Sequence, residues 1–141
     1  MKITLERLND NFHFIAKNER GHTIEIDSRK EFGGADLGPS PMELLLFGLA
    51  SCSAIDIVSI LKKQKQTISN YTAEVEGIRV SDGGASPFKE IFLLIKLKGE
   101  IESEKAIKAA QLSFEKYCSV AKTLEPTAQI NYKIILNNQE L

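Results

Sequence analysis

The chain has 141 residues, of which 43% are hydrophobic and 26% charged, and its 18 basic and 19 acidic side chains give a formal charge of −1. This composition is typical of a soluble globular protein, and we expect one domain spanning residues 1–141. A nearly balanced charge argues against a nucleic-acid partner and against an anionic membrane surface. Because only two cysteines occur and no signal-peptide pattern is seen, we expect a cytoplasmic protein without structural disulfides.

The first 27 residues predict three short antiparallel strands. Apolar and polar residues alternate on both sides of Asn9-Asp10-Asn11, and again after the turn at Arg20-Gly21, which is typical of hairpin strands. Residues 32–39 are too glycine-rich for a regular element. We expect them to form a loop that leads to a helix and that could help to wall a pocket.

A long helix is predicted to begin at Pro41 and to continue to Lys63. Ser40 is a favourable capping residue, proline is tolerated at the first helical position, and Glu43 can complete a capping box. Almost every sector of the helix is apolar, so we expect it to be buried on most sides. The exceptions recur at spacings of three and four and therefore share one stripe: Gly48, Cys52, Asp56, Ser59 and Lys63.

This helix is long enough to raise the possibility of a membrane span. Glu43 and Asp56, however, leave only twelve uncharged residues between them, too few to cross a bilayer. We therefore predict the central helix of a soluble protein. Such a helix, about 36 Å long at 1.5 Å per residue, is difficult for one small domain to cover, so we expect a homodimer in which the partner covers part of it.

The second half of the chain predicts a further antiparallel hairpin. Residues 71–80 and 91–97 alternate between apolar and polar, and a turn is expected between them at residues 82–87. Ser103 is then expected to cap an amphipathic helix. The apolar face of that helix comprises Ala106, Ile107, Ala110, Phe114 and Tyr117.

The chain is predicted to end in a short helix and a closing strand. The helix begins at Cys118 and is stopped by Pro126, and the strand covers residues 128–136. The resulting order, β-β-β-α-β-β-α-β, is typical of an α+β fold with largely antiparallel sheet around the long helix.

The two cysteines are the main candidates for chemistry. Cys52 lies on the semi-polar stripe of the long helix, and Cys118 opens a helix whose N–H groups favour a thiolate. A thiol with a pKa of about 8.5 is mostly protonated at neutral pH, so catalysis would need that pKa to be lowered. Each cysteine could instead be a packing residue, because buried cysteine is common in protein cores.

Other kinds of site have little support in the sequence. His13 and His22 are too far from either cysteine in the predicted order to suggest a Cys–His dyad, and the four residues lack the close spacing of a zinc site. Phosphate loops, dinucleotide fingerprints and hydrolase elbows do not occur in the sequence. We therefore expect neither a metal nor a cofactor.

Two cysteine-containing segments form the most specific pattern in the chain. One runs from Pro41 to Cys52 and the other from Tyr117 to Leu124, and they resemble the two cysteine signatures of the OsmC/Ohr family (osmotically induced protein C and organic hydroperoxide resistance). The segments around Cys52 and Cys118 are most similar to its YhfA-like branch. The residues that carry the resemblance are Pro41-Met42-Glu43-Leu44-Leu45-Leu46, Leu49-Ala50-Ser51-Cys52, and Lys116-Tyr117-Cys118-Ser119-Val120-Ala121 with Leu124.

This resemblance implies a fold and a chemistry. Family members form intertwined homodimers with long helices packed against curved antiparallel sheets and with paired active sites at the interface. Characterised members are thiol peroxidases that reduce organic hydroperoxides. By this resemblance Cys52 and Cys118 would be the catalytic residues: Cys52 would become a sulfenic acid, Cys118 would condense with it to a disulfide, and an external dithiol would reduce the pair. The substrate would be a small hydrophobic hydroperoxide held in an apolar interface pocket.

The sequence departs from the family pattern beside the helix start. The peroxidases pair an N-terminal arginine with a glutamate directly after the proline, but here Met42 follows the proline and Glu43 lies about 100° further around the helix. Candidate substrate-binding residues are therefore Arg20, Arg29, Met42 and Glu43. Asp56, one turn after Cys52, would if ionised disfavour a nearby thiolate.

Two other functions stay open at this stage. A binding protein on the same scaffold could use the apolar cleft to hold a small hydrophobic or sulfur-containing ligand while both cysteines stay reduced. A purely structural dimer could use the cysteines for packing alone. A hydroperoxide-induced disulfide would separate the redox protein from both.

Overall fold

The computed structural model describes residues 1–81 and 83–141. The predicted turn at residues 82–87 includes Asp82, which lies outside the described residues. The chain divides into two compact units, Met1–Leu45 and Leu46–Leu141. The two units contain one sheet each, with three strands in the first and four in the second.

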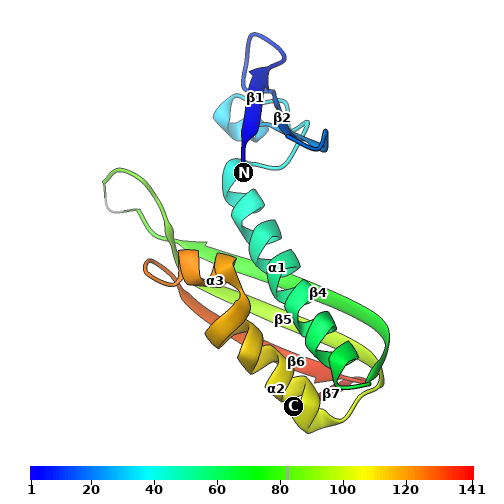
Figure 1. Ribbon diagram of the computed structural model, residues 1–141. Helices are drawn as coiled ribbons and strands as arrows, with labels where there is room; N and C mark the ends of the chain where they lie inside the picture. The colour runs from blue at the N-terminus through cyan, green and yellow to red at the C-terminus, as the bar shows by residue number, and fades with distance from the viewer. Residues whose placement is uncertain (82) are drawn as a thin grey trace. The chain divides into compact units, whose positions relative to one another are not determined.

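The Met1–Leu45 unit contains the three predicted antiparallel strands. They are β1 (Ile3–Arg7), β2 (Phe14–Asn18) and β3 (Thr23–Ile26), paired in the order β1-β2-β3 (Figure 1). A short 3₁₀ turn, η1 (Lys30–Phe32), follows them and was not predicted. Gly33, with a φ of 85°, ends this turn in the left-handed conformation that glycine adopts without strain.

Asp27 organises the glycine-rich loop that follows β3. Its side chain is buried and accepts hydrogen bonds from the backbone N–H groups of Ser28 at 2.7 Å, Ala35 at 3.1 Å and Leu37 at 3.2 Å. Burial by itself would raise the pKa of Asp27, but these N–H groups, together with His13, hold it below its usual value. At Gly34 a Cβ atom would lie 1.8 Å from the Ser28 carbonyl oxygen, so this close approach of the chain requires glycine.

Helix α1 (Pro41–Lys63) begins and ends where the sequence predicts. The carboxylate of Glu43 accepts the backbone N–H of Ser40 at 2.8 Å and its hydroxyl at 2.6 Å. This interaction satisfies a donor that the start of a helix leaves free, which confirms the capping role expected of Glu43.

The expectation that α1 is buried on most sides is wrong for the single chain. The buried residues form one stripe, consisting of Leu49, Ser53, Ile57 and Leu61. On the opposite face Phe47 is 56% and Ile55 is 70% exposed. The reason is geometric, because a single sheet can cover only one side of a helix.

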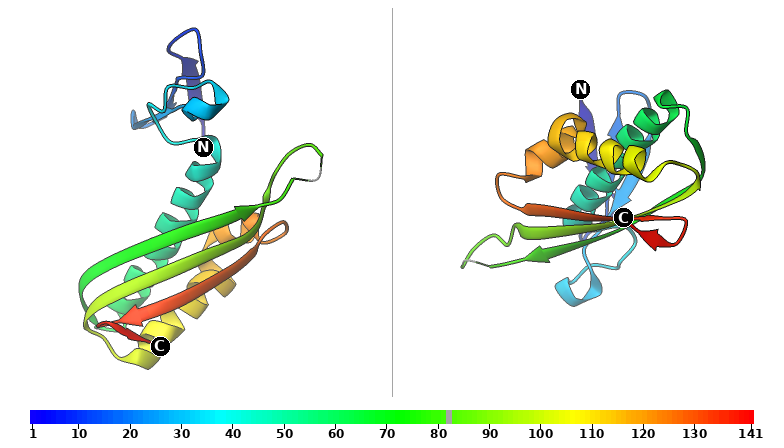
Figure 2. Two further views of the ribbon diagram at one scale, coloured as in Figure 1. Left: turned by 180° about the vertical axis from the view of Figure 1, so that it is seen from behind. Right: turned by 90° about the horizontal axis from the view of Figure 1, so that it is seen from below.

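Length and composition alone would also let α1 cross a membrane. Within the Leu46–Leu141 unit, however, α1 lies with helix α2 (Ser103–Leu112) on one face of the four-stranded sheet, as Figures 1 and 2 show. This is the arrangement of a core helix in a soluble α+β protein.

The four-stranded sheet has the order β4-β5-β6-β7. The antiparallel pair of β4 (Thr67–Arg79) and β5 (Phe88–Glu100) confirms the second hairpin, although both strands are longer than predicted. Strand β6 (Gln129–Leu136) runs parallel to β5, whereas the other four described strand pairs are antiparallel, so the sheet is largely antiparallel as predicted, with this one exception. The helical connection returns the chain to the end of the sheet where β5 began, which imposes the parallel direction. The two-residue strand β7 (Gln139–Glu140) was not predicted.

The core of this unit is built on β5. Its alternating residues Ile91, Leu93, Ile95 and Leu97 are all at most 2% exposed, as the period of two predicts.

Helix α2 starts differently from the prediction. Glu102, rather than Ser103, occupies the capping position, and its N–H donates to Gln66 Oε1 at 2.8 Å. The Glu102 carbonyl accepts the N–H of Ala106 at 3.0 Å, so the helical hydrogen bonds begin one residue early. The prediction that Ser103 caps the helix is therefore wrong.

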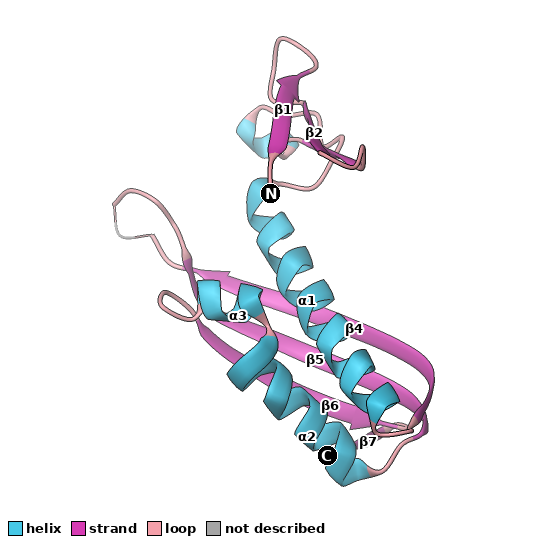
Figure 3. Cartoon of the chain, in the orientation of Figure 1, coloured by secondary structure: helices cyan, strands magenta, loops and turns pink. Residues whose placement is uncertain are grey.

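A π-helical turn, η2 (Ser113–Tyr117), joins α2 to α3 (Ser119–Leu124), the two helices labelled on this connection in Figure 3. The wider turn changes the helical register, so the predicted apolar face does not continue to its end. Phe114 is buried and stacks on Tyr132 with 4.4 Å between ring centroids, whereas Tyr117 is 49% exposed. Ile107 is also 38% exposed, while Ala109 takes a buried place that was not predicted. The short helix after Cys118 is confirmed.

Candidate active site

The fold brings the two cysteines together with one carboxylate. Cys52 and Asp56 lie one turn apart on α1, and Cys118 precedes α3. The two sulfur atoms and a carboxylate oxygen of Asp56 all lie within 4.8 Å of one another. Both cysteines are free thiols in this structure.

Backbone contacts fix Cys118 at this place. Its N–H donates to the Ser113 carbonyl at 2.8 Å, and its sulfur accepts the N–H of Ala121 at 3.4 Å as the N-terminal cap of α3. Helix α3 lies close to α1, since a Cβ at Gly48 would be 3.7 Å from Val120 Cγ1. The glycine on the semi-polar stripe thus leaves room for the segment that carries the second cysteine.

The environments of the two thiols differ. Cys118 is 0% exposed, and Cys52 is half-buried. Burial raises the pKa of the Cys118 thiol to about 11; the Ala121 N–H opposes this shift and the neighbouring Cys52 adds to it. The sulfur that solvent can reach is therefore Cys52, and Cys118 keeps its proton at neutral pH.

Two further residues lie beside the cysteines but were not predicted from the sequence as site residues: Asp56 and Ser113. Asp56 is half-buried, and its Oδ2 accepts the hydroxyl of Ser113 at 3.2 Å. Ser113 is itself 0% exposed. The four-residue spacing from Cys52 to Asp56 was a usable signal, but nothing in the sequence marked Ser113, because its position depends on the π-helical turn.

The predicted arginine and glutamate residues lie in the Met1–Leu45 unit or at its border. Arg29 Nη2 is 3.4 Å from Glu43 Oε1, and Arg29 also approaches Glu31 at 3.8 Å. The hydrogen bonds from Ser40 lower the pKa of Glu43, and the guanidinium of Arg29 contributes to the shift.

The other candidates of this unit have no comparable partner in the described part of the chain. Arg20 is exposed in its turn, where its N–H donates to Asn18 Oδ1 at 2.9 Å, and Met42 is half-buried. The structure thus joins Arg29 to Glu43 and leaves Arg20 and Met42 apart from that pair. Both histidines have nearby partners, His13 with Glu25 at 2.8 Å and His22 with Asn18 at 3.1 Å.

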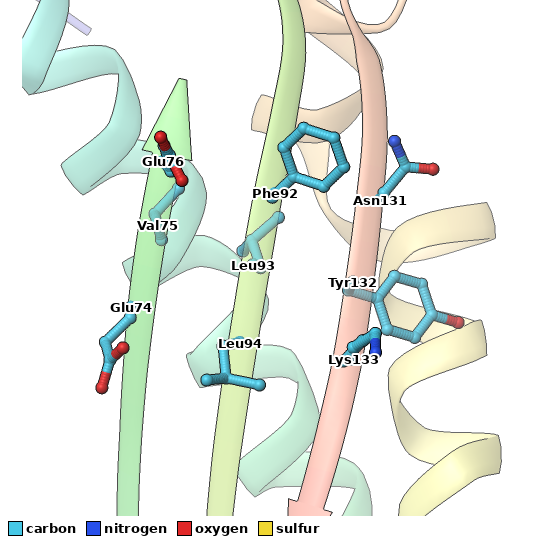
Figure 4. A pocket seen from close by; sticks show the side chains of 9 residues that line it. All are labelled: Glu74, Val75, Glu76, Phe92, Leu93, Leu94, Asn131, Tyr132 and Lys133. Carbon is cyan, nitrogen blue, oxygen red and sulfur yellow. The ribbon is translucent and has the colours of Figure 1, made fainter. Parts of the chain in front are cut away.

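A separate hollow of about 540 Å³ lies along strands β4, β5 and β6 (Figure 4). Glu74, Phe92 and Lys133 are among its nine lining residues, none of which is a cysteine, serine or histidine. The hollow therefore lacks a nucleophile of the kind found in the cysteine cluster.

The structure places a half-buried thiol on a long central helix close to a buried thiol at the start of a second helix. This pair defines a two-cysteine protein on an α+β scaffold. Residues 33–133 match the family model described as OsmC-like protein. The chain therefore belongs to the OsmC-like family, as its cysteine motifs suggested.

Individual relatives agree with this assignment. Protein YhfA of Escherichia coli K12 is 35% identical over 120 residues, which cover 84% of this chain and 86% of that protein. The crystal structure of an OsmC-like protein from Mycoplasma pneumoniae has a TM-score of 0.81 at 22% identity, covering 96% of this chain and 95% of that one. An organic hydroperoxide resistance protein OsmC from Legionella pneumophila has a TM-score of 0.73 at 13% identity, covering 95% and 96%. These two structures share the fold with this chain.

Proposed function

We propose that this chain is a thiol peroxidase that reduces organic hydroperoxides through Cys52 and Cys118. The observation that carries the proposal is the convergence of two free thiols, whose sulfur atoms lie within 4.8 Å of each other. The proposal is further supported by family membership, because the family includes proteins named for organic hydroperoxide resistance.

The chemistry needs two steps in the protein. The Cys52 thiolate attacks the terminal peroxide oxygen; an S–O bond forms, the O–O bond breaks, and the alkoxide takes a proton from solvent and leaves as an alcohol. Cys118 then attacks the sulfur of the sulfenic acid; an S–S bond forms, the S–O bond breaks, and the hydroxide leaves as water with the thiol proton of Cys118. An external dithiol returns two electrons to the disulfide by thiol–disulfide exchange.

The difference in burial supports this division of roles. A hydroperoxide in solution can reach the half-buried Cys52 but not Cys118, which is 0% exposed. The raised pKa of Cys118 keeps it protonated while Cys52 reacts, so it retains the proton that the departing hydroxide requires.

We further propose that the chain forms one OsmC-like domain that acts as a cytoplasmic homodimer. The exposed apolar face of α1, with Phe47 at 56% and Ile55 at 70%, is a surface that a second copy would cover. Arg29 is a better candidate than Arg20 for binding the peroxide, because its guanidinium already pairs with Glu43. The substrate would be a small hydrophobic hydroperoxide.

The test is a thiol count by mass spectrometry before and after one equivalent of cumene hydroperoxide. The wild type should lose both thiols to one disulfide, Cys118→Ser should stop at a sulfenic acid on Cys52, and Cys52→Ser should not react. Ser59→Ala, an exposed change on the same helix, serves as the matched control and should behave as the wild type.

The same experiment separates the alternatives. If both thiols survive the hydroperoxide, the redox function fails. A rise in melting temperature with a small hydrophobic or sulfur-containing ligand would then support a binding protein on this scaffold. If no such ligand changes the melting temperature either, the two cysteines serve packing alone.

A further inference from the structure

We propose that Cys52, Asp56 and Cys118 form a binding site for a thiophilic divalent cation of the zinc type. We also propose that this cation and a hydroperoxide compete for the same two sulfur atoms, a regulatory consequence that rests on the proposed function. The cation site itself stands independently on the geometry of the three side chains.

The three donor atoms are already gathered. The two sulfurs and an Asp56 oxygen lie within 4.8 Å of one another. Tetrahedral zinc, with bonds of about 2.3 Å to sulfur and about 2.1 Å to oxygen, needs donors roughly 3.5 to 3.8 Å apart. Small side-chain rotations would close the remaining difference, since Cys52 and Asp56 come from adjacent turns of one rigid helix.

The donor set also suits the cation chemically. Thiolate ligands favour zinc-type cations over magnesium and calcium, which prefer sites made only of oxygen. Three protein ligands leave a fourth position for water, as in open zinc sites. Because Cys52 and Asp56 are only half-buried, that position can face solvent.

Neighbouring donors hold two of the three ligands in place. The Ser113 hydroxyl donates to Asp56 Oδ2 at 3.2 Å, and the carboxylate keeps further lone pairs for the cation. The N–H of Ala121 donates to the sulfur of Cys118 at 3.4 Å. Two thiolates and a carboxylate around a doubly charged cation carry one net negative charge, and both hydrogen bonds stabilise that charge.

This set differs from the zinc site that the sequence analysis rejected. That hypothesis required four ligands from the cysteines and from His13 and His22, and it lacked close spacing. The present site uses Asp56 in their place, so the fold supplies a ligand combination that cysteine and histidine spacing does not reveal.

The cation and the hydroperoxide compete because both react with the same two sulfur atoms. As the cation binds, each thiol exchanges its proton for a metal–sulfur bond, and the proton goes to the buffer. The bound sulfurs are then unavailable as nucleophiles. Conversely, when the two sulfurs give two electrons to a hydroperoxide, which is reduced to an alcohol and water, they form a disulfide and no longer bind the cation. Oxidation would therefore release it.

The binding test uses the reduced, metal-free full-length chain without oxygen. Titration with Co²⁺ should give a thiolate-to-cobalt charge-transfer band that saturates at one ion per chain and disappears when Zn²⁺ is added. Cys52→Ser and Cys118→Ser should each lose the band. Asp56→Asn should weaken cobalt binding by at least about tenfold, whereas Asp10→Asn, an exposed matched control, should not change it.

A second readout tests the competition without hydroperoxide. Saturating Zn²⁺ should protect Cys52 from alkylation by iodoacetamide, and a chelator should restore the reaction. Absence of the charge-transfer band, or an unchanged band in Cys52→Ser, would overturn the site, and unprotected alkylation would overturn the competition. Because neither readout needs peroxide turnover, failure of the peroxidase proposal would leave both results interpretable. If Cys118→Ser does not fold, the Asp56→Asn and Asp10→Asn pair still decides the site.

Discussion

Helix α1 carries large apolar side chains on two opposite faces that have different surroundings. Leu49, Ile57 and Leu61 are 0% exposed within the chain's own core, whereas Phe47 and Ile55 on the other face are 56% and 70% exposed. Cys52 and Asp56 are half-buried between these extremes. One face is therefore covered by the fold of a single chain, and the other stays exposed in that chain. The cluster of Cys52, Asp56 and Cys118 lies at their border.

The largest expected effect belongs to the buried face. Ile57→Ala removes a fully buried side chain and should lower the free energy of unfolding by about 2 to 5 kcal/mol. Ile55→Ala, two positions away but exposed, should change it by no more than about 0.5 kcal/mol at low protein concentration. Urea unfolding of both variants measures the difference. Equal losses would contradict the distinction between the two faces.

The exposed face should matter for assembly. Ile55→Glu places a charge in the proposed dimer interface and should raise the dissociation constant of the homodimer at least about tenfold, or about 1.4 kcal/mol. Sedimentation velocity gives the constant, and circular dichroism should show unchanged secondary structure. The control is Ile107→Glu on α2, where the wild-type side chain is 38% exposed. A wild-type protein that is monomeric at micromolar concentration would overturn the dimer.

The beginning of α1 is a third environment, in which polar residues near one another in the sequence interact. Hydrogen bonds from Ser40, assisted by Arg29, hold the pKa of Glu43 below its ordinary value of 4.5. A carboxylate with a lowered pKa stabilises the folded state above its ordinary pKa, and this contribution is lost as the pH falls through the lower folded value. Glu43→Gln should therefore cost at most about 1 kcal/mol at neutral pH, with the difference from wild type shrinking in acid.

Denaturation of both proteins at neutral pH and again well below pH 4.5 measures this change. Glu31→Gln is the matched control, because Glu31 is the more distant carboxylate from Arg29, at 3.8 Å. A difference between wild type and Glu43→Gln that stays constant with pH would show that the charge of Glu43 contributes nothing.

These environments also explain what the sequence could predict. The start of α1 was predictable because the signal is local: Pro41 lies between Ser40 and Glu43, and the Glu43 carboxylate accepts the N–H of Ser40. The strands of both hairpins were predictable for the same reason, since alternation and turns are local signals. The family motifs added the pairing of the two cysteines, which the resemblance implied.

What the sequence did not predict depends on distant contacts. Glu102 displaces Ser103 as the cap of α2 at a point where its N–H donates to Gln66, 36 positions earlier. Ser113 reaches Asp56, 57 positions earlier, from a π-helical turn that has no clear sequence signal. The parallel β5–β6 pair likewise depends on the path of the helical connection between the strands. The cation site proposed here could therefore be inferred only from the folded chain.

The smallest expected effect is at Tyr71, on the strand that faces the buried stripe of α1. Its hydroxyl is buried and makes no well-formed hydrogen bond with the described residues; burial raises its pKa to about 12, and the nearby Ser53 hydroxyl opposes this rise. The nearby Ser53 hydroxyl already donates to the carbonyls of Leu49 at 2.9 Å and Ala50 at 3.1 Å. Removing an unpaired buried hydroxyl costs little, so Tyr71→Phe should leave the free energy of unfolding unchanged within about 0.5 kcal/mol or raise it slightly.

Urea unfolding checks this expectation, with Tyr117→Phe as the exposed control. A loss of more than about 1 kcal/mol would mean that the hydroxyl makes a hydrogen bond in solution. Since Tyr71 makes no well-formed hydrogen bond with the described residues, that bond would come from the nearby Ser53 oxygen after a small shift, from water or from a second copy of the chain. Repeating the measurement over a range of protein concentrations separates the last of these sources from the other two, because only a bond to a second copy makes the loss depend on concentration. A concentration-dependent loss would then extend the role of the partner from the exposed face of α1 to the buried one.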